Sequence, residues 1–366
     1  MPYELLTGKK GLSCSLTITP KSNRPHRPFD HNPIYNYVRS RELEGTLAQG
    51  PKPGVWFINA YRARAGWGNV PVSRFPYDAS GVPWPPVEPP GLDQIAKFNR
   101  ILFYQRLFCL DEIKILLCNM ESVQISVPIT KQWYSAPSGL IAMPKHPSEF
   151  IDMHAVQPVG YDDSTQLLLI RNSWGTKWGE NGYGYLPYDY LDSHIQEVWH
   201  HSGYTSLEPN RKTRESEDVS LLTWTNEQPL LGRRIHCFEI HDNVVRERAA
   251  WTFIIESEDG LRVEDLFVRP AFRNRKFGIT LGTNALSLAE YLDRPIDFLI
   301  SRGDTEPPSA NFKALNAFCQ KLQLKVRSVT VPGLKYVAEP GQPTTVMKLD
   351  QQPMKPPMAF LPPEYC

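Results

Sequence analysis

Residues 154–188, HAVQPVGYDDSTQLLLIRNSWGTKWGENGYGYLPY, decide the fold of the first half of the chain. The stretch begins with His154 and places Asn172 inside the block Asn-Ser-Trp-Gly. The segments LLLIRNSW and GYGYLPY are typical of strands, and the glycines between them are typical of turns and close approaches. The stretch therefore predicts sheet structure that carries one histidine and one asparagine.

The segments before this stretch predict helices. Apolar residues at helical spacing indicate helices over 33–47, from residue 93 to about 107 and over 111–118, and SVQISVPI at 122–129 alternates as a strand does. Helices first and an antiparallel sheet afterwards predict an α+β domain.

Four sequence blocks together resemble the papain-like (C1) cysteine peptidases, and most closely the bacterial branch of that family. The Asn-Ser-Trp-Gly block is the most specific, and it is accompanied by NPIYNYVRSRELEG at 32–45, SRFPYD at 73–78 and EIKILLCNMESVQISVPI at 112–129. The resemblance implies a helical half that supplies a cysteine and a sheet half that supplies His154 and Asn172. In this family the histidine takes the thiol proton, the asparagine orients the imidazole, and Trp174 covers their hydrogen bond from water.

The nucleophile is the open question in this resemblance. Cys14 is the candidate by position, but Thr17, Ile18 and Thr19 favour a strand and nearby prolines oppose the long helix that the family places there. The family's oxyanion glutamine is also missing, because no glutamine precedes Gln49. Three interpretations stay open: a displaced nucleophile, an inactive binding scaffold, or a catalytic segment lost from the start of the sequence. Two further cysteines in apolar segments are expected to be buried and unreactive: Cys109 and Cys118.

The second half of the chain predicts a different fold. Strands are expected over 233–243, 246–260 and 260–270, followed by a helix over 277–294, a strand over 295–301, a helix over 311–322 and a strand over 324–331. This order predicts an α/β domain with a mixed sheet.

VEDLFVRPAFRNRKFGITLGTNAL, at 263–286, resembles the acetyl-CoA-binding segment of the GNAT N-acetyltransferases. The resemblance implies that amides at the start of the helix hold the cofactor pyrophosphate, since a helix N-terminus attracts anions. Lys276 stands where the family has its first glycine, Cys319 lies where the family often has a tyrosine acid, and Glu264 is a possible base for acyl transfer. The predicted cofactor-binding residues are Val268, Arg273, Asn274, Arg275, Lys276, Phe277 and Gly278.

Composition bounds the remaining possibilities. The 366 residues carry 40 Lys and Arg against 39 Asp and Glu, so no charge excess points to nucleic acid or to an anionic membrane. The predicted organisation is a papain-like domain over 1–203, a linker over 204–220, a GNAT-like domain over 221–338 and a proline-rich tail over 339–366. The six scattered cysteines and the lack of a leader-like N-terminus favour a cytoplasmic protein, and no metal site is predicted.

The leading functional prediction is hydrolysis of a peptide or amide bond by Cys14, His154 and Asn172, with a peptide or protein as substrate and no cofactor for that domain. The alternative is an acyl-CoA-dependent N-acyltransferase whose papain-like domain is an inactive scaffold that binds the substrate. A third possibility is a binding protein built from two degenerate enzyme domains.

Overall fold

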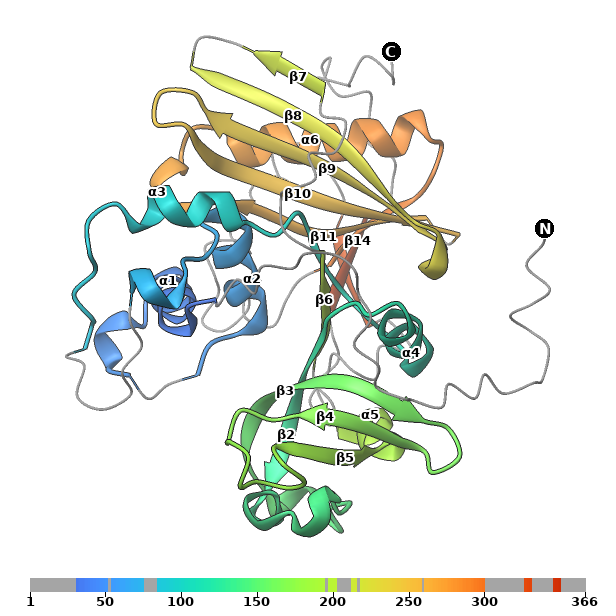
Figure 1. Ribbon diagram of the computed structural model, residues 1–366. Helices are drawn as coiled ribbons and strands as arrows, with labels where there is room; N and C mark the ends of the chain where they lie inside the picture. Colours follow the sequence, from blue (N-terminus) through green and yellow to red (C-terminus); the bar gives the residue numbers. More distant parts are fainter. Residues whose placement is uncertain are drawn as a thin grey trace. The chain divides into compact units, whose positions relative to one another are not determined.

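The computed structural model describes residues 31–51, 54–75, 84–194, 197–202, 212–215, 218–258, 260–299, 326–330 and 345–349 (Figure 1). These residues form two compact units, which are described separately. The first contains residues 106–200, and the second combines residues 31–105 with those from 201 onward. The units therefore divide the chain at other points than the predicted boundaries, because the helical segment before residue 106 belongs with the second sheet.

The first unit is built on an antiparallel sheet with strand order β1-β6-β2-β3-β4-β5. Its strands are β1 (Tyr104–Arg106), β2 (Val123–Thr130), β3 (Phe150–Asp162), β4 (Leu167–Arg171), β5 (Tyr183–Pro187) and β6 (Glu197–His201). Two helices accompany the sheet, α4 (Leu110–Cys118) and α5 (Tyr188–His194). Short 3₁₀ turns lie between β2 and β3: η5 (Lys131–Ser135), η6 (Pro137–Gly139) and η7 (Pro147–Glu149).

The burial pattern of the first unit matches the periodicity of its sequence. Val123, Ile125 and Val127 of β2 are fully buried at every second position, as the sequence pattern predicts for a strand with one core face. Ile113 and Leu116 bury one face of α4 at a helical spacing of three. The predicted helix over 111–118 and the predicted strands over 122–129, 167–174 and 182–188 are confirmed, apart from residues at their ends.

The second unit begins with helices α1 (Pro33–Glu44), α2 (Phe57–Gly66) and α3 (Leu92–Ala96), and with the 3₁₀ turns η2 (Leu47–Gln49), η3 (Val72–Arg74) and η4 (Lys97–Asn99). Helix α1 starts where the Asn32 side chain accepts a hydrogen bond from the Tyr35 amide at 2.9 Å, and it ends at Gly45 with a positive φ of 67°. The expected helix over 33–47 is thus confirmed.

The helix expected from residue 93 to about 107 is wrong in its second half. Helix α3 stops at Ala96, and Tyr104–Arg106 is a strand. The residues that follow η4 are buried without helical period, with Ile101, Phe103 and Tyr104 at most 2 % exposed. Burial on two sides of an extended segment overrides the local helix preference here.

The sheet of the second unit has the order β13-β14-β12-β11-β10-β9-β8-β7. Strands β7 to β11 form antiparallel neighbours, whereas β12 pairs with β11 in parallel, with α6 (Phe277–Tyr291) connecting them in sequence. The strands are β7 (Lys212–Glu215), β8 (Val219–Gln228), β9 (Arg233–Asp242), β10 (Glu247–Ser257), β11 (Gly260–Val268), β12 (Ile296–Leu299), β13 (Val326–Thr330) and β14 (Thr345–Leu349). Two 3₁₀ turns, η8 (Pro229–Leu231) and η9 (Pro270–Phe272), complete the unit.

Two strands lie in segments that the sequence predicts as linker and tail. Strand β7 falls within the predicted linker over 204–220, and its charged composition is typical of the sheet edge that it forms. Strand β14 falls within the predicted tail over 339–366 and pairs with both β12 and β13. Its sequence TVMKL has two β-branched residues and no proline, so it can complete a ladder although prolines surround it. The predicted helix over 311–322 lies outside the described residues.

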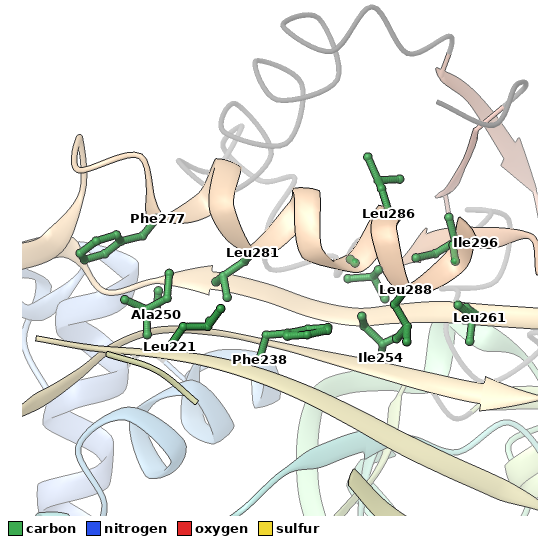
Figure 2. Packing of buried hydrophobic residues seen from close by; sticks show 14 of the residues in the cluster. Leu221, Phe238, Ala250, Ile254, Leu261, Phe277, Leu281, Leu286, Leu288 and Ile296 are labelled. Atoms are coloured by element: carbon green, nitrogen blue, oxygen red, sulfur yellow. The ribbon is translucent and has the colours of Figure 1, made fainter. Parts of the chain in front are cut away.

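Helix α6 packs on one face of this sheet. Phe277, Leu281 and Leu288 of α6 meet strand residues such as Phe238 and Ile254 in a continuous apolar core (Figure 2). The helix spacing of four, three and four predicted from Leu281, Ala285, Leu288 and Leu292 accounts for this face.

The other face of the sheet is polar and aromatic and is covered by α2 and by the chain around Tyr104. Arg62 of α2 forms a two-fold ion pair with Asp265 of β11, with Nη2–Oδ1 at 2.7 Å and Nε–Oδ2 at 3.0 Å. Both side chains are almost fully buried, and the Tyr104 hydroxyl donates to the same carboxylate. Trp251 donates its indole N–H to the Tyr104 oxygen at 3.1 Å. This buried network joins the helical segment and the sheet into one core.

Candidate active site

His154 lies on β3, which pairs with β2 so that His154 is opposite Val127. The imidazole is half-buried, and this burial lowers the pKa of His154 below its ordinary value, while the hydrogen bond to Asn172 and the charge of Asp152 act in the opposite direction. A histidine of this kind is neutral at pH 7 and can accept a proton.

Asn172 follows β4 directly and brings its side chain to the imidazole. The distance between His154 Nε2 and Asn172 Oδ1 is 2.8 Å, and the Ser173 amide donates to the same oxygen at 2.7 Å. The Asn172 amide itself donates to the carbonyl of Gly182 at 3.0 Å, which fixes the backbone of this turn. Since Asn172 Oδ1 accepts, the imidazole carries its proton on Nε2 and leaves Nδ1 as the acceptor.

Trp174 covers the pair. Its ring lies 4.6 Å from the imidazole, centroid to centroid, at an interplanar angle of 31°. Trp178 meets Trp174 edge-on at 5.8 Å, and the buried Trp178 indole N–H donates to the Trp133 carbonyl at 2.6 Å. An apolar ring over a hydrogen bond keeps water from competing for it.

A glycine turn holds the tryptophans in place. A Cβ at Gly179 would lie 2.2 Å from the Tyr183 carbonyl oxygen, so the close approach of the two chain segments requires glycine. A Cβ at Gly184 would lie 2.7 Å from the Trp178 ring. Gly179 and Gly184 are thus packing positions for Trp174 and Trp178, which together form the lid of the site.

The structure brings together His154, Asn172 and Trp174, as expected from the sequence. Cys14 lies outside the described residues, so its distance from His154 stays a prediction. The expectation that Cys109 and Cys118 are buried is wrong, because both are exposed. They stand at the two ends of α4, whereas the buried face of that helix is formed by Ile113 and Leu116.

Sequence reasoning missed Tyr134. This residue lies in η5, and its ring stacks on Trp174 at 5.2 Å and 17° while remaining 60 % exposed. The signal in the sequence is an aromatic pair, Trp133 and Tyr134, in the turn η5 that follows β2. Its contact with a residue 40 positions later has no periodic signature.

The predicted cofactor residues lie in the second unit, at the junction of β11 and α6. Val268 ends β11, and Phe277 and Gly278 begin α6, with the Phe277 ring in the apolar core. Arg275 donates to Asp242 at 2.5 Å, and its guanidinium lies 4.8 Å from the centre of the Phe277 ring. The exposed side chains of the turn are Arg273, Asn274, Arg275 and Lys276.

Glu264 lies at a register shift between β10 and β11, and its side chain is fully buried. Arg262 Nε donates to its carboxylate at 3.2 Å. The predicted base is therefore held in an ion pair away from solvent.

None of the described helices is long and apolar enough to span a membrane. In the same residues, no group of three or more His, Cys, Asp and Glu side chains has a geometry suited to a metal ion.

Comparison with known proteins gives matches around the His154 and Asn172 region. The family model described as "Papain family cysteine protease" matches residues 93–210. An uncharacterized peptidase C1-like protein of Acanthamoeba polyphaga mimivirus is 43% identical over 54 residues, 15% of this chain and 17% of that protein. A senescence-specific cysteine protease of Arabidopsis thaliana is 50% identical over 42 residues, 11% of this chain and 12% of that protein.

Among solved structures, xylellain, a cysteine protease from Xylella fastidiosa, aligns with a TM-score of 0.44 and 24% identity, over 47% of this chain and 70% of the other. The matched segments span 17% and 12% of the two sequence relatives. The family match covers both members of the hydrogen-bonded pair and the tryptophan over it. Residues 93–210 of the chain therefore match the papain family of cysteine proteases.

Proposed function

We propose that the protein is a thiol-dependent hydrolase of peptide or amide bonds in which Cys14 is the nucleophile, His154 the base and acid, and Asn172 the orienting residue. The observation that carries this proposal is the 2.8 Å hydrogen bond between His154 Nε2 and Asn172 Oδ1 beneath Trp174. It fixes the tautomer and leaves Nδ1 as the basic nitrogen, which takes the thiol proton in the proposed mechanism.

The chemistry follows from these roles. Nδ1 takes the Cys14 proton, the thiolate forms a C–S bond to the carbonyl carbon of the substrate, and the carbonyl oxygen becomes an oxyanion. The imidazolium then gives its proton to the leaving nitrogen as the C–N bond breaks, which leaves a thioester. A water molecule, deprotonated by His154, attacks the thioester, and the C–S bond breaks to release the acid and restore the thiol.

Asn172 stabilises each imidazolium state because its Oδ1 accepts the hydrogen bond that Nε2–H donates. The hydrogen bond raises the pKa of His154 while burial lowers it, and burial is the larger effect. The site thus keeps an imidazole that is neutral at rest, and Asn172 orients it in both the neutral and the charged state.

Alkylation of Cys14 by iodoacetamide, followed residue by residue by mass spectrometry, tests the proposal. A thiol paired with a base reacts as a thiolate, so His154→Ala is expected to slow the alkylation of Cys14 at pH 7 by about tenfold or more. Asn172→Ala is expected to fall between the parent and His154→Ala. Cys14→Ser is expected to abolish hydrolysis of a casein substrate.

Cys109 and Cys118 serve as internal controls, since both are exposed and lie on α4. Their alkylation rates are expected to be the same in all variants. Labelling of Cys14 that is indifferent to His154→Ala would overturn the proposal and favour an inactive scaffold.

A second activity, acetyl-CoA-dependent N-acylation, is proposed for the second unit on one observation. Lys276, with a φ of 64°, precedes α6 and gives it no side-chain cap, so no side chain among the described residues satisfies the first-turn amides. Those amides, with exposed Arg273 and Lys276 beside them, fit a pyrophosphate. Arg275 does not fit this role, because Asp242 and the Phe277 ring already hold it.

When bound, acetyl-CoA would supply the acyl group, and the chain would supply the anion site and, through Glu264, a proton acceptor for the amine. The ion pair with Arg262 would have to open for Glu264 to act. In this activity the papain-like domain would bind the peptide to be acylated.

The resemblance to the bacterial branch of the papain-like peptidases and the cytoplasmic location of the protein remain predictions.

Thermal unfolding with acetyl-CoA tests this second proposal. A ligand at 100 times its Kd adds about 2.7 kcal/mol of stability, which raises Tm measurably. Lys276→Glu is expected to reduce the shift, and Lys177→Glu, at an exposed position of the first unit, is expected to leave it unchanged. No shift at millimolar acetyl-CoA would contradict acyl transfer.

A further inference from the structure

Tyr134 is an exposed aromatic residue that reaches the site through Trp174, with no ring contact or hydrogen bond to His154 or Asn172. Its ring stacks nearly parallel on Trp174, with centroids 5.2 Å apart at 17°, and Trp174 lies 4.6 Å from the imidazole. Yet 60 % of Tyr134 is exposed to solvent, and its hydroxyl has no hydrogen-bond partner among the described residues. Among the described residues, this stacking contact is the one that links Tyr134 to the site.

Trp178 contacts Trp174 in a different geometry from Tyr134. Trp178 meets Trp174 at an interplanar angle of 89°, so its edge bounds Trp174 without stacking on it. Trp178 is itself fixed by its bond to the Trp133 carbonyl and by the lack of a side chain at Gly184. Among the described rings that contact Trp174, Tyr134 and His154 are the two inclined to it by less than 35°.

We propose that Tyr134 is a positioning residue that holds Trp174 over the hydrogen bond between His154 and Asn172. The importance of this role for catalysis rests on the proposed function. Its direct effect is on the proton exchange and the pKa of His154, which can be measured without catalysis. The residues adjacent in sequence to Tyr134 support such a role: Trp133 is buried and bonded to Tyr190, so the backbone of η5 is anchored while Tyr134 points outward.

The energetics set the size of the effect. A stacked aromatic pair contributes about 0.5–1.5 kcal/mol beyond its buried area, which corresponds to an about two- to twelvefold change in how often Trp174 leaves the imidazole. When Trp174 leaves, water reaches His154 Nε2 and competes with Asn172 Oδ1 for its proton.

The exchange of the His154 Nε2 proton with water, followed by NMR in the full chain with ¹⁵N-labelled histidine, tests the role. Tyr134→Ala is expected to speed this exchange about two- to twelvefold. It is also expected to raise the pKa of His154, since burial is what lowers it most. Asp152 and Asn172, which act on His154 in the opposite direction, are unchanged in this variant. His154→Gln identifies the signal.

Tyr134→Phe retains the ring and is expected to match the parent in both measurements. Tyr134→Leu retains apolar bulk without a stacked ring and is expected to resemble Tyr134→Ala. Tyr183→Ala removes another exposed tyrosine of the same unit and is the matched control, with no expected change.

Three outcomes would overturn the role: Tyr134→Ala with parental exchange and titration, Tyr134→Phe behaving like Tyr134→Ala, or an equal change in Tyr183→Ala. A His154 signal that responds to Tyr134→Ala, in a protein whose Cys14 labelling ignores His154→Ala, would uphold the positioning role and reject the thiol chemistry.

Discussion

Three histidines whose pKa is lowered by burial make the stability of this protein sensitive to acid. Burial lowers the pKa of His31 from 6.5 to about 4, with the charge of Arg64 acting in the same direction, and it also lowers the pKa of His154 and of His236. A histidine whose pKa is lower in the folded state binds its proton more readily when unfolded. Protonation therefore favours the unfolded chain.

The free energy of unfolding is expected to be highest above pH 6.5 and to fall as the pH drops from about 6.5 to about 4, the interval between the unfolded and folded pKa of His31. Urea unfolding at half-unit pH steps measures this dependence. His31→Gln is expected to flatten it, whereas His146→Gln, at an exposed position, is expected to leave it unchanged. A stability that is constant or rises toward pH 4 would contradict the assignment.

Residue identities predict part of the site because its motif is local. His154, Asn172 and Trp174 lie within 21 positions, so the antiparallel pairing of β3 with β4 suffices to bring them together. Tyr134 could not be predicted, because its stacking depends on how η5 folds back toward Trp174. The exposure of Cys109 and Cys118 was also missed, since an apolar neighbourhood in sequence does not say which end of a helix reaches solvent.

At the scale of elements, periodicity predicts the helices and strands whose partners are apolar. Helix α6 has an apolar stripe and lies where the sequence places it. Helix α2 has no such stripe, because its buried face includes the charged Arg62. The partner of Arg62 is Asp265, which lies 203 positions away. Strand β14 was missed for a related reason: its place between β12 and β13 is set by partners that a proline-rich context does not reveal.

Gly184 of β5 supplies a prediction about packing. Gly184→Ala would place a Cβ 2.7 Å from Trp178 and 3.0 Å from the Gly139 carbonyl oxygen. Because Trp178 is buried and hydrogen-bonded, it cannot yield freely, and a loss of about 1–3 kcal/mol is expected. Denaturant unfolding followed by tryptophan fluorescence measures it.

Gly54→Ala is the control for this substitution, since its Cβ would meet nothing within 4 Å. It is expected to change stability by less than about 0.5 kcal/mol, as surface substitutions usually do. A Gly184→Ala variant as stable as Gly54→Ala would mean that Trp178 moves easily and does not anchor the lid of the site.

At the scale of the whole molecule, two sequence resemblances do not mean two independently folding domains. The second unit takes its helices α1, α2 and α3 from the segment before residue 106 and its sheet from the segment after residue 201. Trp251 and Phe253 project from the sheet face that α2 and Tyr104 cover, and Asp265 is paired there with Arg62. Without the helical segment, this face would expose two large aromatic rings and leave a carboxylate without its guanidinium.

A fragment of residues 221–338, the predicted second domain, is therefore expected not to fold cooperatively. It lacks Arg62 and Tyr104 as well as β14, and removing one partner of a buried ion pair alone costs about 3–5 kcal/mol, a large part of the stability of a domain. Circular dichroism during heating measures the transition, with the full chain as the reference. In the full chain, Asp265→Ala is expected to lower Tm strongly, while Asp189→Ala, at an exposed position of the first unit, is expected to have little effect. A cooperative transition and dispersed NMR signals from the 221–338 fragment would show that the sheet needs neither the helices nor β14, and would restore the boundary at residue 221.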